Sequence, residues 1–359
     1  MMTNSNPKVL ILQGVIASYR VPIFNIIAEQ FDLTVAYYLK DGSKAECKFK
    51  KQNLKYNQIG PFVWIKSLRK YCNQFDVVIF PNDLHIPCFC LLPFGYNKYK
   101  AITWGIGLRA SYTRLYDTTR KHTLLDRITQ CIYSVSDASI FYMEKSKEFW
   151  RNTSLDLNKV FVAINTTAVI DIEQQPLLKN SLLFVGTLYK EKGLYTLLSA
   201  YKEAAHRIQN IPVLNIVGDG DEAQELKQFV VDNKLAEKVF FHGAIFEESI
   251  LSSFFQKALL CISPNQAGLS VAKSMGYGVP FVTYEKSITG GERYHISHGV
   301  NGLLYEKDAD LVDIIVDVST NSDKYIEMGA QAKSYYENNA TPQHMAQGAI
   351  DAINYVLNR

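Results

Sequence analysis

The second half of the chain alternates short apolar strands with helical segments, and this alternation limits the folds available to it. Runs rich in Val, Ile, Leu and Phe recur at 182–185, 213–217, 239–242 and 259–262, and each is followed by a turn of small residues. This pattern is typical of a parallel sheet covered by helices on both faces. Because ligands of such sheets bind outside the carboxyl ends of the strands, we expect a site where these turns converge.

The turn after the fourth of these strands is the most informative one. The strand ends in Ser263-Pro264, Gly268 leads into a helix that stops at Gly276, and a second apolar strand follows at 280–284. A helix that begins just beyond a strand end presents free backbone N–H groups to an anion. Gly268 allows a phosphate to approach closely and Ser270 adds a hydroxyl. An ordinary strand-turn-helix of an α/β domain is the alternative.

The first half repeats the α/β pattern less regularly. We expect a strand over 9–12 that ends at Gly14, a helix over 22–30, and further strands at 33–38, 76–80, 101–104, 138–141 and 160–163. The polar segment 165–180 is the expected linker. We therefore predict domains at 1–170 and 171–340, with a last helix in 341–359 whose apolar stripe packs it back on the first domain.

Composition places the protein among cytosolic proteins that are soluble or bound to a surface. With 359 residues, 47% of them hydrophobic, the chain can build two full cores. No apolar run reaches the roughly 20 residues of a membrane span, and the N-terminus shows no cleavable signal pattern. The six cysteines have neither a metal-ligand spacing nor the pattern of a disulfide framework.

Charge is unevenly divided between the two halves. Residues 1–170 hold 22 Lys and Arg against 12 Asp and Glu, whereas the rest of the chain is acidic. A basic half predicts an anionic partner, such as a phosphorylated lipid, a membrane surface or nucleic acid. Nucleic acid is the weaker candidate because no recognition helix, zinc finger or aromatic sheet motif accompanies the charge. The alternative is that these charged side chains form an ordinary solvated surface that binds no partner.

Six short motifs in the second half carry a family resemblance. They are Phe184-Val185-Gly186 with Glu191-Lys192-Gly193, Val217-Gly218-Asp219-Gly220, Phe241-His242-Gly243, Gly268-Leu269-Ser270, Gly278-Val279-Pro280 and Asn301-Gly302-Leu303-Leu304. In this order and spacing they resemble glycosyltransferase family 4, retaining enzymes with two facing Rossmann-like domains, the GT-B architecture. In the first half, Ser18-Tyr19-Arg20-Val21-Pro22 and the Trp104-Gly105 turn resemble a branch that builds bacterial surface polysaccharides.

The resemblance implies a site for a nucleotide-diphosphate sugar. The implied donor-binding residues are Gly14, Thr187, Lys192, Gly218, Asp219, Ala244, Asn265, Gly268, Leu269, Ser270 and Lys273. The implied catalytic residues are Lys192, Lys273 and Glu292. Arg20 and Arg109 follow strand ends in the basic half and are candidates for an acceptor phosphate, with a purely structural role as the alternative. We expect neither a metal nor a cofactor beside the donor.

The chain departs from the family pattern at the phosphate turn and after two strands. Two glutamates eight residues apart are usual where this chain has Asn265 and Lys273, and a common arginine is replaced by Thr187. Lys192 must then neutralise more of the negative charge of the diphosphate. Lys273 can bind a phosphate oxygen or a sugar hydroxyl. The family often has a histidine after Trp-Gly, where this chain has Ile106. A retaining transfer needs no dedicated base, so the loss of this histidine is compatible with activity.

These features together predict a retaining hexosyltransferase of surface polysaccharide biosynthesis. We expect it to move a sugar from a nucleotide-diphosphate sugar to a lipid-linked saccharide acceptor at the inner face of the membrane. The partners predicted are therefore the donor, this acceptor and an anionic membrane surface, without nucleic acid. A sugar-nucleotide epimerase of the same fold and a catalytically silent nucleotide-sugar-binding subunit are the alternatives. The sequence leaves the nucleotide, the sugar and the linkage open.

Overall fold

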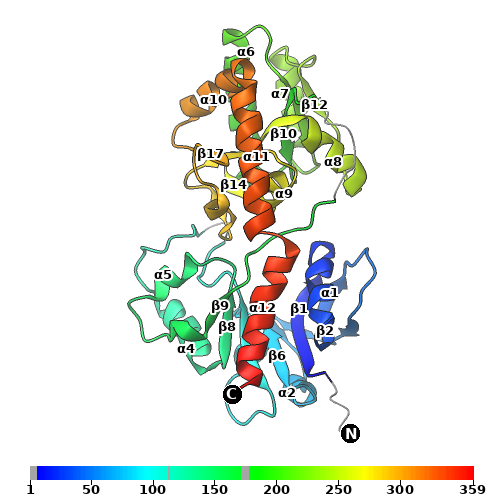
Figure 1. The fold of residues 1–359 in the computed structure, drawn as a ribbon, viewed down its shortest axis with the longest axis vertical. Coiled ribbons are helices and arrows are strands. Elements are labelled where there is room, and N and C mark those ends of the chain that lie inside the picture. Colours follow the sequence, from blue (N-terminus) through cyan, green and yellow to red (C-terminus); the bar gives the residue numbers. More distant parts are fainter. Residues whose placement is uncertain (1–5, 112–113, 171–177) are drawn as a thin grey trace. The chain divides into compact units, whose positions relative to one another are not determined.

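The computed structural model describes residues 6–111, 114–170 and 178–359. The chain divides into two compact units, which we call unit 1 (Met1–Arg109, Asp117–Asn165 and Pro342–Arg359) and unit 2 (Ala110–Tyr116 and Thr166–Thr341). The centre of the expected linker, including Pro176, lies outside the described residues. Both units are α/β, with the elements labelled in Figure 1. The α/β class expected from the sequence is confirmed.

Unit 1 contains a seven-stranded parallel sheet in the order β3-β2-β1-β6-β7-β8-β9. Its strands are β1 (Lys8–Ile16), β2 (Asp32–Asp41), β3 (Lys50–Asn53), β6 (Val77–Phe80), β7 (Lys100–Gly105), β8 (Ala138–Phe141) and β9 (Val160–Val162). Its helices are α1 (Val21–Ala28), α2 (Leu68–Cys72), α3 (Pro87–Cys90), α4 (Leu124–Val135), α5 (Ser146–Trp150) and α12 (Pro342–Leu357). A separate antiparallel hairpin is formed by β4 (Asn57–Ile59) and β5 (Phe62–Trp64).

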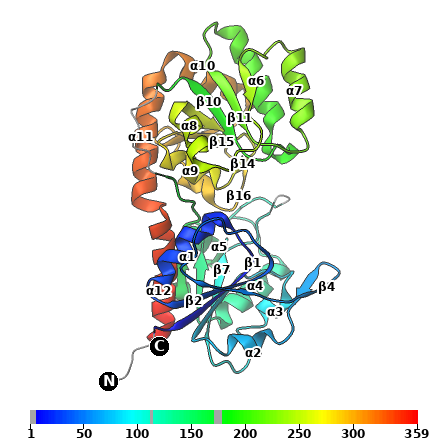
Figure 2. The same cartoon turned by 90° about the vertical axis from the view of Figure 1, so that its right-hand side faces the viewer.

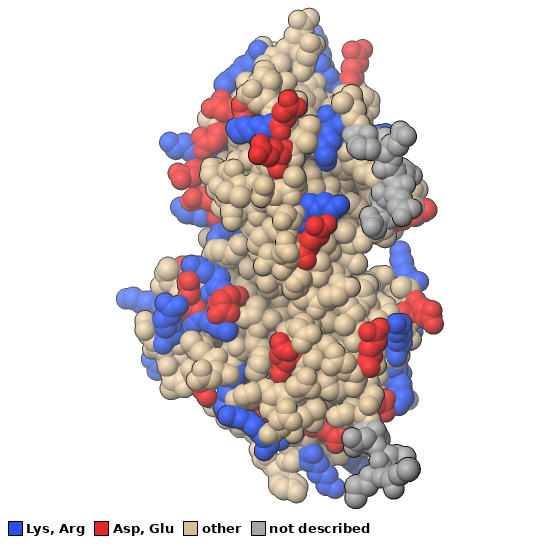
Figure 3. Space-filling view, in the orientation of Figure 1, with Lys and Arg blue, Asp and Glu red and all other residues tan. Residues whose placement is uncertain are grey.

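The last helix belongs to unit 1, although the segment directly before it, Thr166–Thr341, belongs to unit 2. Met345, Ala349 and Ile353 of α12 are fully buried in one apolar cluster with Val9 and Ile11 of β1. Apolar side chains at this helical spacing form a single stripe, which the sheet covers. On the face drawn in Figure 3, the surface of α12 is largely uncharged, while Lys and Arg lie toward its flanks. The expected packing of the C-terminal helix on the first domain is confirmed.

Unit 2 contains a six-stranded parallel sheet in the order β12-β11-β10-β13-β15-β17. Its strands are β10 (Ser181–Val185), β11 (Val213–Val217), β12 (Val239–Phe241), β13 (Ala258–Ile262), β15 (Phe281–Tyr284) and β17 (Gly302–Tyr305). Its helices are α6 (Leu194–Arg207), α7 (Ala223–Asp232), α8 (Glu248–Lys257), α9 (Ser270–Gly276), α10 (Asp308–Thr320) and α11 (Ser322–Asn339). Every strand and helix expected between residues 182 and 284 is present, with ends displaced by a few residues at most.

One expected strand end is wrong. The sequence analysis ended the first strand at Gly14, but β1 continues through this residue to Ile16. The pairing with β2 shifts between Gln13 and Val15, so Gly14 lies at a bulge inside the strand. A bulge adds one residue without ending the ladder, which is why a glycine that resembles a turn is compatible with a longer strand. A methyl group built on Gly14 would lie 3.3 Å from the Tyr38 hydroxyl.

Candidate nucleotide-sugar site

The turns after four strands of unit 2 meet along one side of its sheet. We call this surface the glycine edge and define it as Gly186–Lys192, Gly218–Gly220, Gly243-Ala244 and Asn265–Ser270. Backbone hydrogen bonds join the turns in sequence: Gly186 N donates to Val217 O at 3.0 Å and Gly218 N donates to Gly243 O at 2.8 Å. Because parallel strands end on the same side of a sheet, four separate turns become neighbours. The predicted convergence is confirmed.

Glycine is required at this edge because two backbones pass very close to one another. A methyl group built on Gly218 would lie only 1.8 Å from the Gly186 carbonyl oxygen. By contrast, a methyl group built on Gly268 would meet no atom within 4 Å. Gly218 therefore serves the packing of the turns, whereas the surroundings of Gly268 are open, as a close approach by a ligand requires.

Lys192 lies in the middle of the glycine edge. It ends the short 3₁₀ helix η3 (Lys190–Lys192), and its carbonyl oxygen accepts a hydrogen bond from Asn265 N at 3.3 Å. Its side chain reaches the first turn, since a methyl group built on Gly186 would lie 3.4 Å from Nζ. Nζ also lies 5.8 Å from the centre of the Tyr189 ring. Lys192 thus contacts the β13 turn through its backbone, while its side chain lies against the β10 turn.

The electrostatics of Lys192 distinguish it from ordinary surface lysines. Burial lowers the pKa of its ammonium group to about 8, and the nearby Glu292 carboxylate opposes this shift. No carboxylate among the described residues forms an ion pair with Lys192. Lys192 is half-buried, and an ammonium group in such a place is stabilised by an incoming anion, which replaces part of the lost solvation.

Glu292 is brought to the same region by a small two-stranded sheet. The strands β14 (Gln266–Ala267) and β16 (Ile288–Thr289) are parallel and place Ala267 beside Thr289. The Glu292 carboxylate is 5% exposed and accepts hydrogen bonds from Gly290 N at 2.8 Å and Thr289 Oγ1 at 3.1 Å. Its position is therefore fixed, and the phosphate turn and the Glu292 segment are held side by side.

Ser270 offers a hydroxyl that its own unit leaves without a partner. Its Oγ is buried and has no hydrogen-bond partner within the described part of the chain. Buried polar atoms in proteins are nearly always hydrogen-bonded, so this hydroxyl is a candidate for an oxygen of a ligand. Leu269 lies directly before it at the start of α9. The predicted residues of the phosphate turn are thus together with Lys192 at one edge.

Lys273 lies on α9 but is engaged elsewhere. Its Nζ donates to Glu248 Oε2 of α8 at 2.6 Å, and the Tyr277 hydroxyl donates to Glu248 Oε1 at 2.7 Å. The lysine that replaces an expected glutamate therefore links α9 to α8 by an ion pair. Sequence reasoning missed Glu248 because nothing in its local pattern indicates a partner 25 residues away.

The remaining predicted residues divide between the two units. Thr187, Asp219 and Ala244 are exposed on the glycine edge. Gly14, Arg20 and Arg109 belong to unit 1. Arg20 is 9% exposed and donates to Tyr142 Oη at 2.9 Å and to Asn165 Oδ1 at 2.9 Å. The structure thus gives Arg20 the structural role that was the alternative. Arg109 follows β7 and is half-buried.

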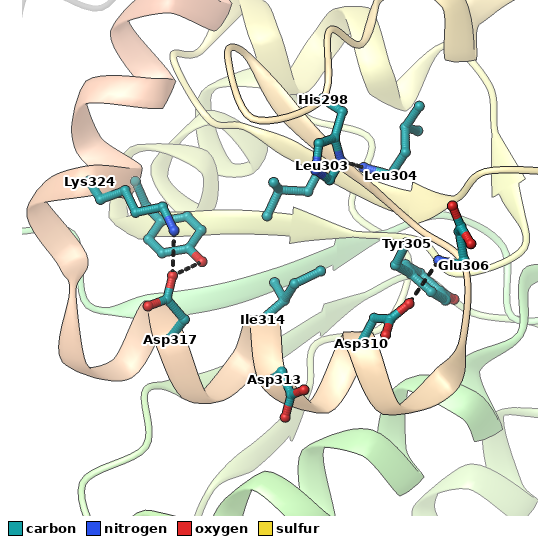
Figure 4. Close-up of a pocket in the computed structure, with 11 residues that line it drawn as sticks. His298, Leu303, Leu304, Tyr305, Glu306, Asp310, Asp313, Ile314, Asp317 and Lys324 are labelled. Carbon is teal, nitrogen blue, oxygen red and sulfur yellow. Dashed lines mark hydrogen bonds and ion pairs between the residues drawn. The ribbon is translucent and has the colours of Figure 1, made fainter.

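A second cavity in unit 2 has the wrong charge for a diphosphate. It measures about 430 Å³ and lies against α10 and β17 (Figure 4). Its ionised side chains are Glu306, Asp310, Asp313, Asp317 and Lys324. Asp317 already accepts hydrogen bonds from Lys324 and Tyr325, each at 2.7 Å. An excess of carboxylates repels a phosphate group, so the glycine edge is the better candidate.

Two kinds of site are not found among the described residues. No group of three or more His, Cys, Asp or Glu side chains there could hold a metal ion. The helices in that part of the chain are too short or too polar to cross a membrane.

Unit 2, with its parallel sheet and glycine-rich turns, resembles domains of a known protein family. Residues 179–321 match the family described as glycosyl transferases group 1. The chain is 25% identical over 232 residues to the poly(glycerol-phosphate) alpha-glucosyltransferase of Bacillus subtilis. That match covers 62% of this chain but 33% of the relative, so the chain spans about a third of its length.

Solved structures show the same fold over nearly the whole chain. Alr3699/HepE of Anabaena in complex with UDP has a TM-score of 0.72 at 15% identity. The superposition covers 97% of this chain and 99% of the HepE chain. WaaG, a glycosyltransferase involved in lipopolysaccharide biosynthesis, has a TM-score of 0.64 at 12% identity. This superposition covers 94% of this chain and 98% of the WaaG chain. The chain has the GT-B fold, and residues 179–321 are similar to the glycosyl transferases group 1.

Proposed function

We propose that this protein is a glycosyltransferase that uses a nucleoside diphosphate sugar as its donor. The observation that carries the proposal is Lys192, a half-buried ammonium group without an ion pair among the described residues, held where four turns of unit 2 converge. Alr3699/HepE was solved with UDP and also with UDP-glucose, which makes a uridine nucleotide the first donor to test.

The proposed chemistry follows from the charge that develops during transfer. The bond between the anomeric carbon and the phosphate oxygen breaks, a bond from the acceptor oxygen forms, and the diphosphate leaves with increasing negative charge. The Lys192 ammonium and the Ser270 hydroxyl stabilise that charge at the glycine edge. The acceptor proton passes to the departing phosphate, so a separate base is not required. Glu292, fixed by two hydrogen bonds, is proposed to hold hydroxyls of the transferred sugar.

We further propose that transfer proceeds with retention and without a metal ion. In this scheme acceptor and leaving group meet the anomeric carbon on the same face, which preserves its configuration. The Bacillus relative is an alpha-glucosyltransferase, which fits retention from an α-linked donor. Lys192 takes the charge-neutralising role that a divalent ion has in other phosphate sites.

The proposed acceptor is a saccharide carried on a lipid at the inner face of the membrane. The excess of Lys and Arg in residues 1–170 supports an anionic surface or acceptor on that side of the chain. WaaG is involved in lipopolysaccharide biosynthesis, and the Bacillus relative is a poly(glycerol-phosphate) alpha-glucosyltransferase. We therefore propose a role in surface polysaccharide biosynthesis, with the protein bound peripherally in the cytoplasm.

A catalytically silent nucleotide-sugar-binding subunit is the second candidate. One observation favours it: Lys273 stands where the family usually has a glutamate, and its ammonium is committed to Glu248. A binding subunit keeps Lys192 and the phosphate turn but needs no transfer. An epimerase of the same fold has no feature in the structure that favours it.

A panel of donors separates these functions. The full-length protein is incubated with UDP-, GDP-, dTDP- and ADP-sugars, with and without a membrane extract that supplies acceptors, and nucleotide release and sugar transfer are measured. The proposal predicts nucleotide release with one donor class and a product that keeps the anomeric configuration. Binding of a donor without release or transfer would instead identify a silent subunit, and a new epimeric nucleotide sugar would identify an epimerase.

A further inference from the structure

The hairpin β4–β5 exposes an apolar face that its own unit does not cover. The pairing Asn57↔Trp64, Gln58↔Val63 and Ile59↔Phe62 places Ile59, Phe62 and Trp64 on one face, because side chains alternate along a strand. These three side chains are 68%, 47% and 43% exposed. Figure 2 shows β4 projecting from the body of unit 1.

The opposite face of the hairpin anchors it to unit 1. Val63 packs against the apolar cluster around α3, and its N–H donates to His85 O at 2.9 Å. Apart from each other, β4 and β5 pair with no other described strand. A two-stranded hairpin is only marginally stable in water, so its position depends on this anchor. The Ile59–Phe62–Trp64 face contributes nothing to the anchor and is available to a partner.

The sequence around the hairpin is rich in Lys and Arg, of which Lys48, Lys50 and Lys51 form ion pairs with Glu29, Asp32 and Asp41. Residues 47–75 contain seven Lys and Arg and no Asp or Glu. Lys55 and Lys66 lie on either side of the hairpin and Lys70 follows on α2; all three are exposed. None of the three forms an ion pair with another described residue. The hairpin therefore presents apolar side chains with unpaired lysines beside them. The headgroup region of an anionic bilayer favours both aromatic side chains and lysines.

We propose that the β4–β5 hairpin docks the protein on an anionic lipid surface, with Ile59, Phe62 and Trp64 entering the headgroup region. A second copy of the chain is a poorer occupant, since it would bring an equally cationic hairpin against the first. A protein partner is also disfavoured, because lysines are depleted from protein interfaces. The inference deepens the proposed membrane role and does not depend on which donor is used.

Trp64 reports on this docking without a label. The chain has three tryptophans, and the other two, Trp104 and Trp150, are 5% and 0% exposed. The full-length protein is mixed with phosphatidylcholine vesicles, with or without phosphatidylglycerol, and Trp emission and acrylamide quenching are recorded. With phosphatidylglycerol, the emission should shift to shorter wavelength and quenching should decrease. Added salt should reverse part of the effect, because the lysine contribution is screened.

Matched variants locate the docking element. The double variant Ile59→Ser/Phe62→Ser keeps the reporter and should weaken co-sedimentation with anionic vesicles by about tenfold or more, since two large apolar side chains no longer enter the lipid. Lys55→Ala/Lys66→Ala should weaken it less and remove part of the salt dependence. Ile128→Ser on α4 is the control, because Ile128 is also 43% exposed in unit 1 and lies outside the hairpin.

The outcomes are distinct from those of the donor assays. Co-sedimentation with unchanged Trp64 emission, or loss of binding in Ile128→Ser alone, would place the docking surface elsewhere and overturn the proposal. Absence of any binding to anionic vesicles would overturn it as well. UDP binding and nucleotide release are measured on the same variants without vesicles; they should match the unsubstituted protein, so failure of the docking proposal leaves the transferase proposal standing.

Discussion

The carboxyl ends of β1 and β10 carry similar sequence signals but have different structures. After β10, glycine turns bring backbones together and leave Lys192 half-buried without an ion pair among the described residues. Along β1, Gly14 is a bulge inside the strand, and Arg20 beyond it is hydrogen-bonded to Tyr142 and Asn165. A glycine or a cation near a strand end is therefore ambiguous until its existing contacts are known. Of these two regions, the one after β10 offers Lys192 and the Ser270 hydroxyl to a ligand.

The largest difference between the two regions should appear when their glycines are enlarged. Gly218→Ala forces a methyl group against the Gly186 carbonyl, and we expect a loss of stability on the order of 3 kcal/mol or more. Gly14→Ala meets the Tyr38 hydroxyl at 3.3 Å and should cost less than about 1 kcal/mol. Urea unfolding of both variants measures this, and equal losses would show that the two glycines serve the same purpose.

The two lysines of unit 2 should differ strongly in their effect on turnover. Lys192→Ala should reduce the rate of transfer by about 10²-fold or more, the scale of losing one group that stabilises the developing charge. Lys273→Met removes an ion pair with Glu248 and should reduce the rate less than about tenfold, mainly through loosening of α9. Steady-state kinetics with the active donor compares them. Full turnover by Lys192→Ala would remove this residue from the mechanism.

Arg20 should affect stability but not donor binding. Arg20→Met leaves the Asn165 and Tyr142 side chains without a hydrogen bond each, which should cost about 2 kcal/mol of unfolding free energy. Thermal unfolding measures the loss, and nucleotide affinity of the folded variant should be unchanged. A stable Arg20→Met protein that has lost acceptor turnover would restore the acceptor role expected from the sequence.

The smallest predicted effect is a dependence on pH. The pKa of Lys192 is about 8 in the fold, below its ordinary value of 10.5, so the ammonium loses its proton above pH 8. We expect kcat/KM for the donor to fall roughly fivefold between pH 8 and 9, and this step to be absent in Lys192→Ala. The pKa of Lys192 is lower in the folded protein than in the unfolded chain. Holding the charged side chain in the fold therefore opposes folding below pH 8, and the free energy of unfolding rises between pH 8 and 10.5. A flat profile up to pH 9 contradicts this assignment.

The helices and strands of unit 2 could be predicted from the sequence. The contacts and exposure of its side chains could not. Strands such as β11 and helices such as α12 were predicted at their observed bounds because periodicity and glycine turns are local signals. The bulge at Gly14 depends on pairing with β2, which is 18 or more residues away in the chain. The engagement of Lys273 by Glu248 and the exposure of the β4–β5 hairpin are likewise products of tertiary packing, and no local pattern indicates them.

The central claim is that the donor diphosphate binds at the glycine edge between Lys192 and the turn at Gly268. Calorimetric titration of UDP into the unsubstituted protein, Lys192→Ala and Gly268→Val tests it most directly. A methyl group at position 268 meets no atom within 4 Å, so the valine variant should fold normally while obstructing the diphosphate. We predict binding to the unsubstituted protein, at least roughly tenfold weaker binding to Lys192→Ala, and almost none to Gly268→Val. Equal UDP affinity in all three folded proteins would contradict the account and place the donor elsewhere.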